Sequence, residues 1–256
     1  MTCDLTCIIT GHREGRIAVP SLRSFWKAVE AARAAGYAVE VILCLDRPDV
    51  LTRKVFATYK GDAVAFDEYD VADQGKVRNA AVQKAKGRYT AFLDADDLWT
   101  ENWLVQALEF LKDKPETHIA HPEFNYFFEK QATIFTHIDQ ESPAFRLDLL
   151  RVANYWDALC VCPTAIYREI PFCDRDIAAG YAYEDWFWNC ETVAAGNIHK
   201  VVPGTVLFKR RQDSSQTMKA AANKSLTRRH PLMDYNHEMY AAEDAARAQT
   251  SQAELS

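Results

Sequence analysis

The sequence lacks several features that would assign it to common protein classes. Its 256 residues contain no apolar run long enough to cross a bilayer, and no positive segment precedes an apolar stretch at the amino end. Neither a Gly-x-Gly-x-x-Gly nor a Walker sequence follows any expected strand, which argues against a dinucleotide-binding domain and a P-loop phosphotransferase. We therefore expect a cytoplasmic protein whose membrane contact, if any, is peripheral at the inner membrane face.

An excess of positive charge is also missing. The chain has 30 Lys and Arg against 36 Asp and Glu, which gives a formal net charge of −6. Because no long basic stripe offsets this balance, we expect no nucleic-acid partner. The seven cysteines are odd in number and lie mostly in apolar, strand-like runs without zinc-ligand spacing. We interpret them as reduced thiols of the core.

The first part of the chain alternates strand-like and helical patterns up to about residue 112. This alternation is typical of βαβ units that build a mostly parallel sheet. The expected strands lie at residues 5–10, 39–45, 63–66 and 89–93. A helix is expected between the first two, with a buried stripe of Leu22, Phe25, Trp26 and Val29 and an end at Gly36. A second helix is expected at about residues 75–86.

The pattern changes after residue 118. Two short strands joined by a tight turn are expected at residues 124–128 and 132–138. A short helix is expected at residues 147–153 and an apolar run at residues 159–167. A helix at residues 184–195, which ends at Gly196, is followed by two strands at residues 198–202 and 205–208.

The last part of the chain becomes polar and rich in alanine from about residue 213. We therefore expect one α/β domain over residues 1–212 and a polar tail, helical or partly ordered, over residues 213–256. The tail could lead to a further domain or partner. Its basic residues could touch an anionic surface, although weak basic clusters are more often simply solvated; they are Lys219, Lys224, Arg228 and Arg229.

The most informative stretch is residues 87–99, in which an apolar strand runs directly into Asp94, Asp96 and Asp97. Acids at the carboxyl end of a buried strand suit a divalent cation and the phosphates that it carries. Mg²⁺ or Mn²⁺ is the natural guest for ligands that are all oxygens. The alternative is that these acids only cap the helix expected to start near Thr100.

Polar residues also follow the first two expected strands. The first strand leads into Thr10-Gly11-His12-Arg13-Glu14, and the second leads into Asp46-Arg47-Pro48-Asp49. Open parallel sheets bind ligands at the carboxyl ends of their strands, where the strand order reverses. These segments should therefore lie near the aspartate cluster, and a nucleotide held by acids and a metal fits such an edge.

Two segments carry a family resemblance. Residues 74–81 (Gln-Gly-Lys-Val-Arg-Asn-Ala-Ala) and 85–97 together resemble the central block of family 2 inverting glycosyltransferases with the GT-A fold. Residues 183–186 (Tyr-Glu-Asp-Trp) resemble that family's later Glu-Asp motif, and the resemblance extends to about Thr217. It implies an α/β fold of GT-A type, with a Rossmann-like, mostly parallel sheet, flanking helices and a smaller antiparallel portion.

The resemblance also implies a nucleotide-sugar site. Its expected members are Thr10, Glu14, Asp46, Arg78, Asp94 and Asp96. Asp46 would contact the nucleotide base, and Arg78 would lie near the base or the phosphates. Asp96 would ligate the metal, while Asp94 would face the ribose or the metal. The alternative for Arg78 is a solvated helix face, the usual position of charges at this spacing.

The later motif supplies the expected catalytic pair, Asp185 and Glu184, with Asp185 as the general base. Without the resemblance, both acids could simply favour the amino end of a helix through its dipole. Trp186 is an expected acceptor contact, since its ring could stack on a sugar. However, a helix with Trp186, Phe187 and Trp188 in sequence must bury at least one of these rings in the core.

The expected chemistry agrees with this set of residues. Displacing a nucleoside diphosphate from a sugar builds negative charge, which a divalent cation offsets. The attacking acceptor hydroxyl needs one carboxylate as general base, and direct displacement inverts the anomeric centre. We expect a metal-dependent inverting glycosyltransferase that uses a nucleotide-diphosphate sugar, UDP by family frequency. The acceptor would be a hydroxyl of a glycan or lipid-linked glycan.

Two other functions stay open at this point, a metal-dependent nucleotidyltransferase and a non-catalytic nucleotide-sugar-binding module. Specificity should lie in the loops at residues 137–148 and 172–180. Gln212 stands where the family often has a histidine, so Arg210 or Arg211 could grip the diphosphate through the planar fork of the guanidinium.

Overall fold

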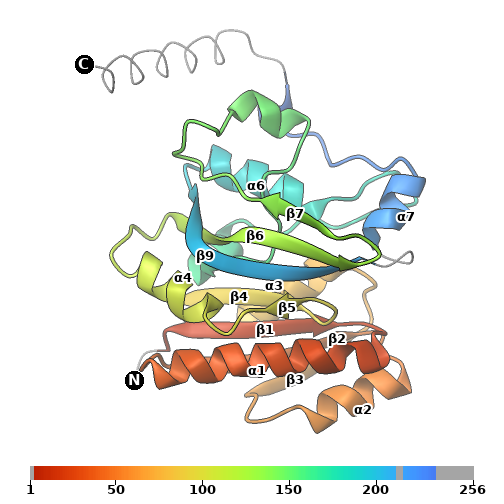
Figure 1. Ribbon diagram of the computed structural model, residues 1–256. Coiled ribbons are helices and arrows are strands. Elements are labelled where there is room, and N and C mark those ends of the chain that lie inside the picture. Colours follow the sequence, from red (N-terminus) through yellow and green to blue (C-terminus); the bar gives the residue numbers. More distant parts are fainter. Residues whose placement is uncertain (1–2, 212–215, 235–256) are drawn as a thin grey trace.

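The computed structural model describes residues 3–211 and 216–234. One mixed sheet runs through this part of the chain, with the strand order β3-β2-β1-β4-β8-β6-β9-β5 and with β7 paired to β6 (Figure 1). The strands are β1 (Leu5–Gly11), β2 (Val39–Asp46), β3 (Ala65–Tyr69), β4 (Tyr89–Asp94), β5 (Leu98–Trp99), β6 (His118–Glu129), β7 (Thr133–Thr136), β8 (Val161–Pro163) and β9 (Ile198–Arg211).

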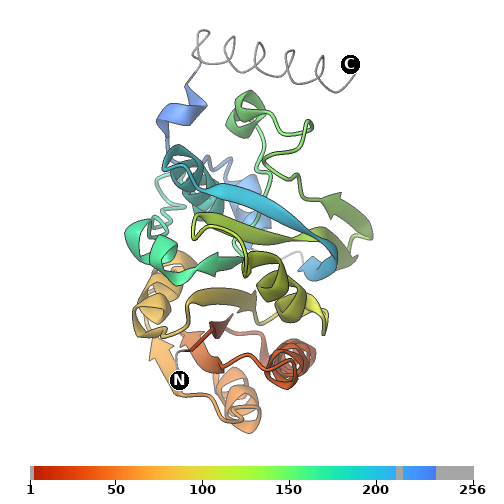
Figure 2. The ribbon, with the colours of Figure 1, turned by 90° about the vertical axis from the view of Figure 1, so that its left-hand side faces the viewer.

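Helices lie on both faces of this sheet. They are α1 (Ala18–Ala34), α2 (Val50–Thr58), α3 (Gln74–Lys84), α4 (Trp103–Leu111), α5 (Thr164–Glu169), α6 (Glu184–Ala194) and α7 (Gln216–Ala222), with the short 3₁₀ helices η1 (Gly15–Ile17), η2 (Leu147–Arg151) and η3 (Pro231–Met233). Helices α1 and α4 pack together on one face, while α3 and α5 pack together on the other (Figure 2). The predicted two-sided α/β architecture is therefore present.

Strand β1 is the centre of the parallel half. It is buried along its whole length and pairs in parallel with β2 on one side and β4 on the other. Thr10 is in register with Asp94, and Gly11 with Leu45, so the three strands end at the same edge. Because the chain turns from β2 and β3 back to β4 across β1, the strand order reverses at this edge, where such sheets bind ligands.

The stripe predicted for α1 is largely confirmed. Leu22, Phe25 and Val29 are fully buried against the sheet. Trp26 is only partly buried, because its indole nitrogen reaches out to donate to the carbonyl of Tyr59 at 2.7 Å. Helix α2 was not predicted; it begins after Asp49, whose side chain accepts from the Thr52 N–H at 2.7 Å.

The second half of the chain differs from its prediction in two places. The strands expected at residues 198–202 and 205–208 form one continuous strand, β9. Gly204 adopts a φ of +72°, and the pairing of β9 with β6 shifts its register at the same position, so the strand continues through the irregularity. The apolar run at residues 159–167 divides into β8 and α5, since the chain becomes helical at Thr164. The predicted β6–β7 hairpin is confirmed, and β6 begins earlier, at His118.

The cysteines are free thiols, and five of them are buried. Those five are Cys7, Cys44, Cys160, Cys162 and Cys190, whereas Cys3 and Cys173 are partly exposed. Within residues 3–211 and 216–234, no helix is both long and apolar enough to cross a bilayer. The cytoplasmic location and the domain boundary near residue 212 stay predictions. Of the expected tail, residues 213–215 and 235–256 lie outside the described part of the chain.

Gly87 lies where the turn before β4 presses against β1. A Cβ atom at this position would lie 2.3 Å from the backbone nitrogen of Thr6 and 2.6 Å from the carbonyl carbon of Leu5. The Gly87 N–H donates to Thr6 Oγ1 at 2.9 Å, and its carbonyl accepts from Thr164 Oγ1 at 2.6 Å. Only glycine fits this contact, which gives the glycine of the 85–97 block a packing role.

We expect Gly87→Ala to lower the free energy of unfolding by about 3 kcal/mol, because overpacking against backbone atoms forces β1 and β4 apart. Urea denaturation would measure this loss. The matched control is Lys86→Ala at the neighbouring exposed position, which should stay within about 0.5 kcal/mol of the wild type. Equal denaturation midpoints for Gly87→Ala and the control would contradict the packing role.

Candidate active site

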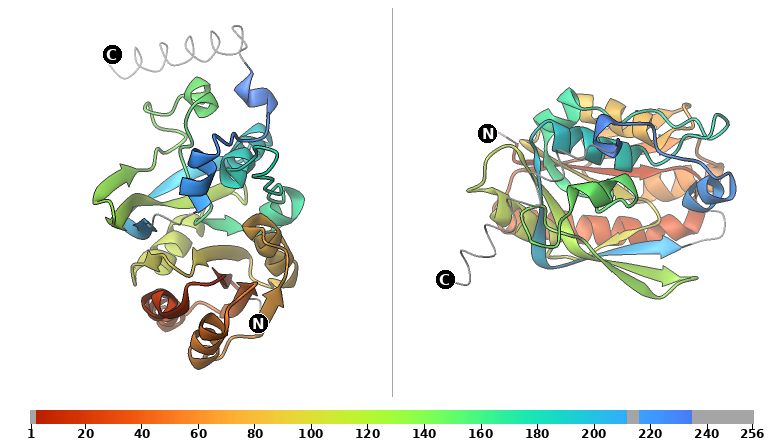
Figure 3. Two further views of the ribbon diagram at one scale, coloured as in Figure 1. Left: turned by 90° about the vertical axis from the view of Figure 1, so that its right-hand side faces the viewer. Right: turned by 90° about the horizontal axis from the view of Figure 1, so that it is seen from above.

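Charged and polar side chains gather at the edge where β1, β2 and β4 end, which faces the viewer in Figure 3, left. Asp94, the last residue of β4, is the most connected of them. Its carboxylate accepts from Thr10 Oγ1 at 3.0 Å, from Arg78 Nη2 at 2.8 and 3.1 Å, and from the side-chain amide of Gln74. Thr10, Arg78 and Asp94 therefore lie together, and their predicted binding of a nucleotide sugar stays a prediction.

Arg78 is buried and joins two acids from different parts of the fold. Besides Asp94, its guanidinium pairs with Glu184 at the start of α6, with 3.5 Å between Nη1 and Oε1. It also lies over the rings of Phe92 and Phe172, 5.8 and 5.6 Å from their centroids. Burial alone would lower the pKa of Arg78, but the two carboxylates raise it above the ordinary value. The solvated-face interpretation was wrong for Arg78.

Arg175, in the loop before α6, was not predicted. Its Nε and Nη2 atoms each donate to one carboxylate oxygen of Glu184 at 2.6 Å. Its Nη2 also donates to the side-chain oxygen of Gln74 at 3.1 Å, and its backbone N–H donates to Asp73 at 2.7 Å. Burial would raise the pKa of Glu184, but the charges of Arg175 and Arg78 lower it overall. Glu184 is thus a paired, ionised carboxylate.

Asp185 differs from its neighbour. It is partly exposed, and its Oδ1 accepts from the backbone N–H of Trp186 at 2.8 Å. Burial, followed by the negative charges of Glu184 and Asp157, raises the pKa of Asp185 to about 6. The residue before the pair, Tyr183, adopts a left-handed backbone with φ of +62°, so α6 starts abruptly at Glu184. A carboxylate with this pKa suits proton transfer near neutral pH.

The other two aspartates of the cluster have different surroundings. Asp97 is buried, accepts from the backbone N–H of Arg210 at 2.8 Å, and forms an ion pair of 3.1 Å with Lys209. Asp96 is partly exposed, and no residue in the described ranges 3–211 and 216–234 donates to its carboxylate. Burial and then the charges of Asp97, Asp94 and Glu14 raise the pKa of Asp96 to about 8.

The donor set can be tested against a divalent cation. The described part of the chain contains no group of three His, Cys, Asp or Glu side chains that could hold a metal by themselves. A Mg²⁺-type ion that carries substrate phosphates needs only one or two carboxylates from the protein. Asp96 fits this task, since like charges crowd it and a cation would relieve their repulsion. Asp94 is already held by Arg78, so its direct ligation of a metal stays a prediction.

The remaining residues predicted for the nucleotide lie at the ends of β1 and β2. Asp46 is buried, and its Oδ1 accepts from the backbone N–H of Val71 at 2.9 Å, while its carbonyl contacts the His12 ring. Glu14 accepts from the His12 N–H at 2.7 Å, and its pKa is raised by burial. Both acids therefore border the cluster, and their contacts with a base or ribose stay predictions.

Asp157 was not singled out by the sequence, although it connects the two sides of the site. It lies 3.3 Å from the Lys209 ammonium group, and Lys209 also pairs with Asp97. Its Oδ2 accepts from Asn125 Nδ2 at 2.8 Å. Burial would raise the pKa of Asp157, but Lys209 and His137 hold it below its usual range. Asp157 is thus a fixed negative charge near Asp185.

The aromatic residues after the acidic pair separate into two roles. Trp188 is fully buried, as expected for one ring of the three. Trp186 is partly buried, and its indole N–H donates to the carbonyl of Leu150 at 2.7 Å. This bond fixes the ring beside a buried apolar cluster. The members of that cluster are Phe145, Leu150, Tyr155, Trp156 and Cys190. Contact between Trp186 and an acceptor stays a prediction.

The end of β9 carries the two candidate phosphate-binding arginines. Arg210 is occupied, since it pairs with Glu129 and donates from Nε to the carbonyl of Asp96 at 3.1 Å. The Arg211 guanidinium lies over the ring of Phe127, 4.0 Å from its centroid. Gln212 lies outside the described residues. Of the two arginines, Arg211 is the one without a carboxylate partner in the described ranges.

Comparisons with known sequences agree with this geometry. The family model described as Glycosyl transferase family 2 matches residues 7–173. The uncharacterized protein y4gI of Sinorhizobium fredii is 27% identical over 179 residues, which cover 68% of this chain and 19% of that protein. WfaP of Escherichia coli, a UDP-Glc:alpha-D-GlcNAc-diphosphoundecaprenol beta-1,3-glucosyltransferase, is 29% identical over 43% of this chain and 44% of its own length. The chain thus spans less than half the length of either relative.

Solved structures extend the similarity to the fold. TarS of S. aureus, residues 1–349 in complex with UDP-GlcNAc, superposes with a TM-score of 0.61 at 15% identity, over 83% of this chain and 60% of that one. The mannosyltransferase PcManGT of Pyrobaculum calidifontis, in complex with GDP-Man and Mn²⁺, gives a TM-score of 0.54 at 15% identity, over 80% and 56%. The predicted GT-A fold is confirmed by these neighbours. Because the family model covers more than half of the residues, the chain belongs to glycosyl transferase family 2.

Proposed function

We propose that this chain is a metal-dependent inverting glycosyltransferase that moves a sugar from a nucleotide-diphosphate donor, with UDP favoured, to a hydroxyl of a glycan or lipid-linked glycan. The observation that carries the proposal is the Arg78 bridge. It ties the strand end at Asp94 to the helix start at Glu184, and so brings the donor-side acids and the candidate base Asp185 to one edge of the sheet.

The relatives support the choice of substrates. The name of WfaP gives a UDP-glucose donor and a diphosphoundecaprenol-linked acceptor. The TarS structure is a complex with UDP-GlcNAc, and the PcManGT structure is a complex with GDP-Man and Mn²⁺. A nucleotide-diphosphate sugar is common to both structures. A lipid-linked acceptor is the class that the Escherichia coli relative suggests for this chain.

On the donor side, Asp96 with the help of Asp94 would hold the cation, and Asp46, Thr10 and Glu14 would face the nucleoside. The cation would offset the charge that develops on the departing diphosphate. Arg211 adds a guanidinium near the same acids, since its charge interacts with Asp96 and Asp97 without pairing to either. A planar guanidinium fork matches phosphate oxygens in geometry.

On the acceptor side, Asp185 would remove the proton from the attacking hydroxyl. With a pKa of about 6, it is ionised at neutral pH and still basic enough to accept a proton. Glu184 is a poor candidate for this step, because Arg175 occupies both of its oxygens and its pKa is lowered. Within the predicted catalytic pair we therefore assign Asp185 as the base and Glu184 as a positioning residue.

The first experiment is a thermal-shift panel of UDP, GDP, CDP and dTDP, each with and without Mn²⁺. We expect one nucleotide with Mn²⁺ to raise the Tm by about 5 °C, because a ligand that binds only the folded state stabilises it. Asp96→Asn should abolish this shift and, without metal at pH 8, should itself raise the Tm by relieving repulsion with Asp97 and Asp94. Asp113→Asn, a change at an exposed aspartate just after the end of α4, is the control. A retained shift in Asp96→Asn would reject Asp96 as the metal ligand.

Replacement of the base gives a second prediction. Asp185→Asn should reduce transfer by about 10²–10⁴-fold, the usual contribution of a general base, while the nucleotide-dependent thermal shift persists. A coupled assay of nucleotide release measures the turnover. Glu169→Gln, at the exposed end of α5, is the control for a carboxylate-to-amide change and should retain full rate. Wild-type turnover in Asp185→Asn would rule out its role, and binding without turnover in the wild type would favour the non-catalytic module.

The pH dependence gives a third prediction. Since Asp185 must be ionised to act, kcat/KM should rise with pH through an apparent pKa near 6 and then level. Asp157→Asn removes a nearby negative charge that raises the pKa of Asp185, so this acidic limb should move to lower pH. The profile of kcat/KM against pH measures the shift. A limb that stays in place, or that moves to higher pH, would refute the electrostatic role of Asp157.

A further inference from the structure

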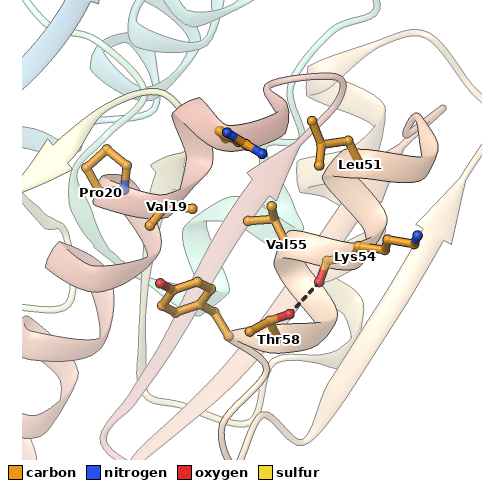
Figure 4. Close-up of a pocket in the computed structure, with 8 residues that line it drawn as sticks. Val19, Pro20, Leu51, Lys54, Val55 and Thr58 are labelled. Atoms are coloured by element: carbon orange, nitrogen blue, oxygen red, sulfur yellow. Dashed lines mark hydrogen bonds between the residues drawn. The ribbon is translucent and has the colours of Figure 1, made fainter.

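A groove of about 520 Å³ lies between the amino-terminal half of α1 and the neighbouring helix α2 (Figure 4). Its apolar lining comes from Val19 and Pro20 on α1, from Leu51 and Val55 on α2, and from Tyr59, which follows α2. None of these residues belongs to the acidic edge described above. The groove therefore needs an explanation of its own.

Exposed apolar side chains extend this groove at the start of α2. Val50 is 65% exposed and Leu51 is 45% exposed, and both belong to the first turn of the helix. Single exposed apolar residues are common, but two neighbouring ones beside an open apolar groove mark a surface that binds a partner or a membrane.

The same face carries unpaired positive charge. Arg16 and Lys54 border the groove, and neither forms an ion pair with any acid of residues 3–211 and 216–234. Further exposed cations without an ion pair in those ranges are Arg13, Arg23, Lys27 and Lys60. The acids nearby are fewer. Asp49 caps α2 and interacts with the charge of Arg13, while Asp62 is paired with Arg33. Glu30 is exposed. This face is locally positive on a chain whose net charge is −6.

We propose that this α1–α2 face docks on a bilayer that contains anionic lipid. Val50 and Leu51 would enter the acyl region, the groove would accommodate part of a chain, and Arg16 and Lys54 would lie against the phosphates. Cations beside an anionic leaflet each contribute favourably to binding, and an apolar insertion adds to them. Charge complementarity favours this occupant over a second copy, because two-fold pairing of the face would place cations against cations.

The α1–α2 face lies next to the candidate donor site. Helices α1 and α2 begin just after the ends of β1 and β2, and the Gly15 N–H donates to Thr52 Oγ1 at 2.9 Å, which joins the loop of Glu14 to α2. The docking face therefore adjoins the edge that holds the candidate donor site. If the proposed function is correct, a bilayer there lies close to where a lipid-linked acceptor must react; the docking itself does not depend on catalysis.

Vesicle co-sedimentation of the full chain tests the proposal. We expect binding to vesicles of phosphatidylglycerol and phosphatidylcholine, little binding to phosphatidylcholine alone, and a decrease as salt rises from about 0.05 to 0.5 M. Arg16→Glu combined with Lys54→Glu should weaken the partition by more than about tenfold. Leu51→Ser combined with Val50→Ser should also weaken it, while the salt dependence remains.

The matched control is Lys76→Glu combined with Lys86→Glu. This pair makes the same change in charge on the α3 side, which is the opposite face of the sheet, so its vesicle binding should stay within about twofold of the wild type. A thermal scan of each variant shows that it is folded. The proposal is overturned by no wild-type binding, by equal binding to neutral vesicles, or by equal loss in the control. Self-association that needs Arg16 and Lys54, without vesicle binding, would instead assign the face to a second copy.

Discussion

The arrangement of the candidate site depends on one buried cation. Arg78 lies between Asp94 and Glu184, two carboxylates that belong to a strand end and a helix start ninety positions apart in the chain. A buried charge is stable only with its partners, and removing one partner typically costs about 3–5 kcal/mol. The Arg78 guanidinium therefore fixes the position of α6 relative to β4. Asp185, which follows Glu184 directly, takes its place at the edge as a result.

The acids of the site divide into two groups by their partners. Glu184 and Asp157 are held ionised by neighbouring cations, so each acts as a fixed negative charge. Asp96 and Asp185 are partly exposed and crowded by like charges, and the pKa of each is raised. Binding a cation or a proton relieves the repulsion at Asp96 and Asp185, and catalysis requires carboxylates with this property. The first group creates the field in which the second group acts.

The sequence predicted what depends on local pattern. Apolar runs predicted the central strands, and the aspartates directly after one of these runs predicted the acidic cluster that begins at Asp94. Arg175 and Asp157 were missed, because each acquires its role from partners that are distant in the chain and carries no local signal. Helix α2 was missed because it is short and does not bury a full apolar stripe: of its nine residues only Thr52 and Phe56 are buried. The prediction of two strands in place of β9 was wrong because Gly204 is typical of a turn in a sequence. In the structure the glycine lies at a register shift inside one continuous strand.

The contacts of Asp97 have a consequence for the synthesis of the protein. Its partners Lys209 and Arg210 lie at the end of β9, and the bond from the Arg210 N–H spans 113 residues. On the ribosome, Asp97 emerges long before either partner exists. During that interval its side chain has neither Lys209 nor the Arg210 N–H as a partner. The donor edge therefore cannot be completed before the chain has been translated to the end of β9.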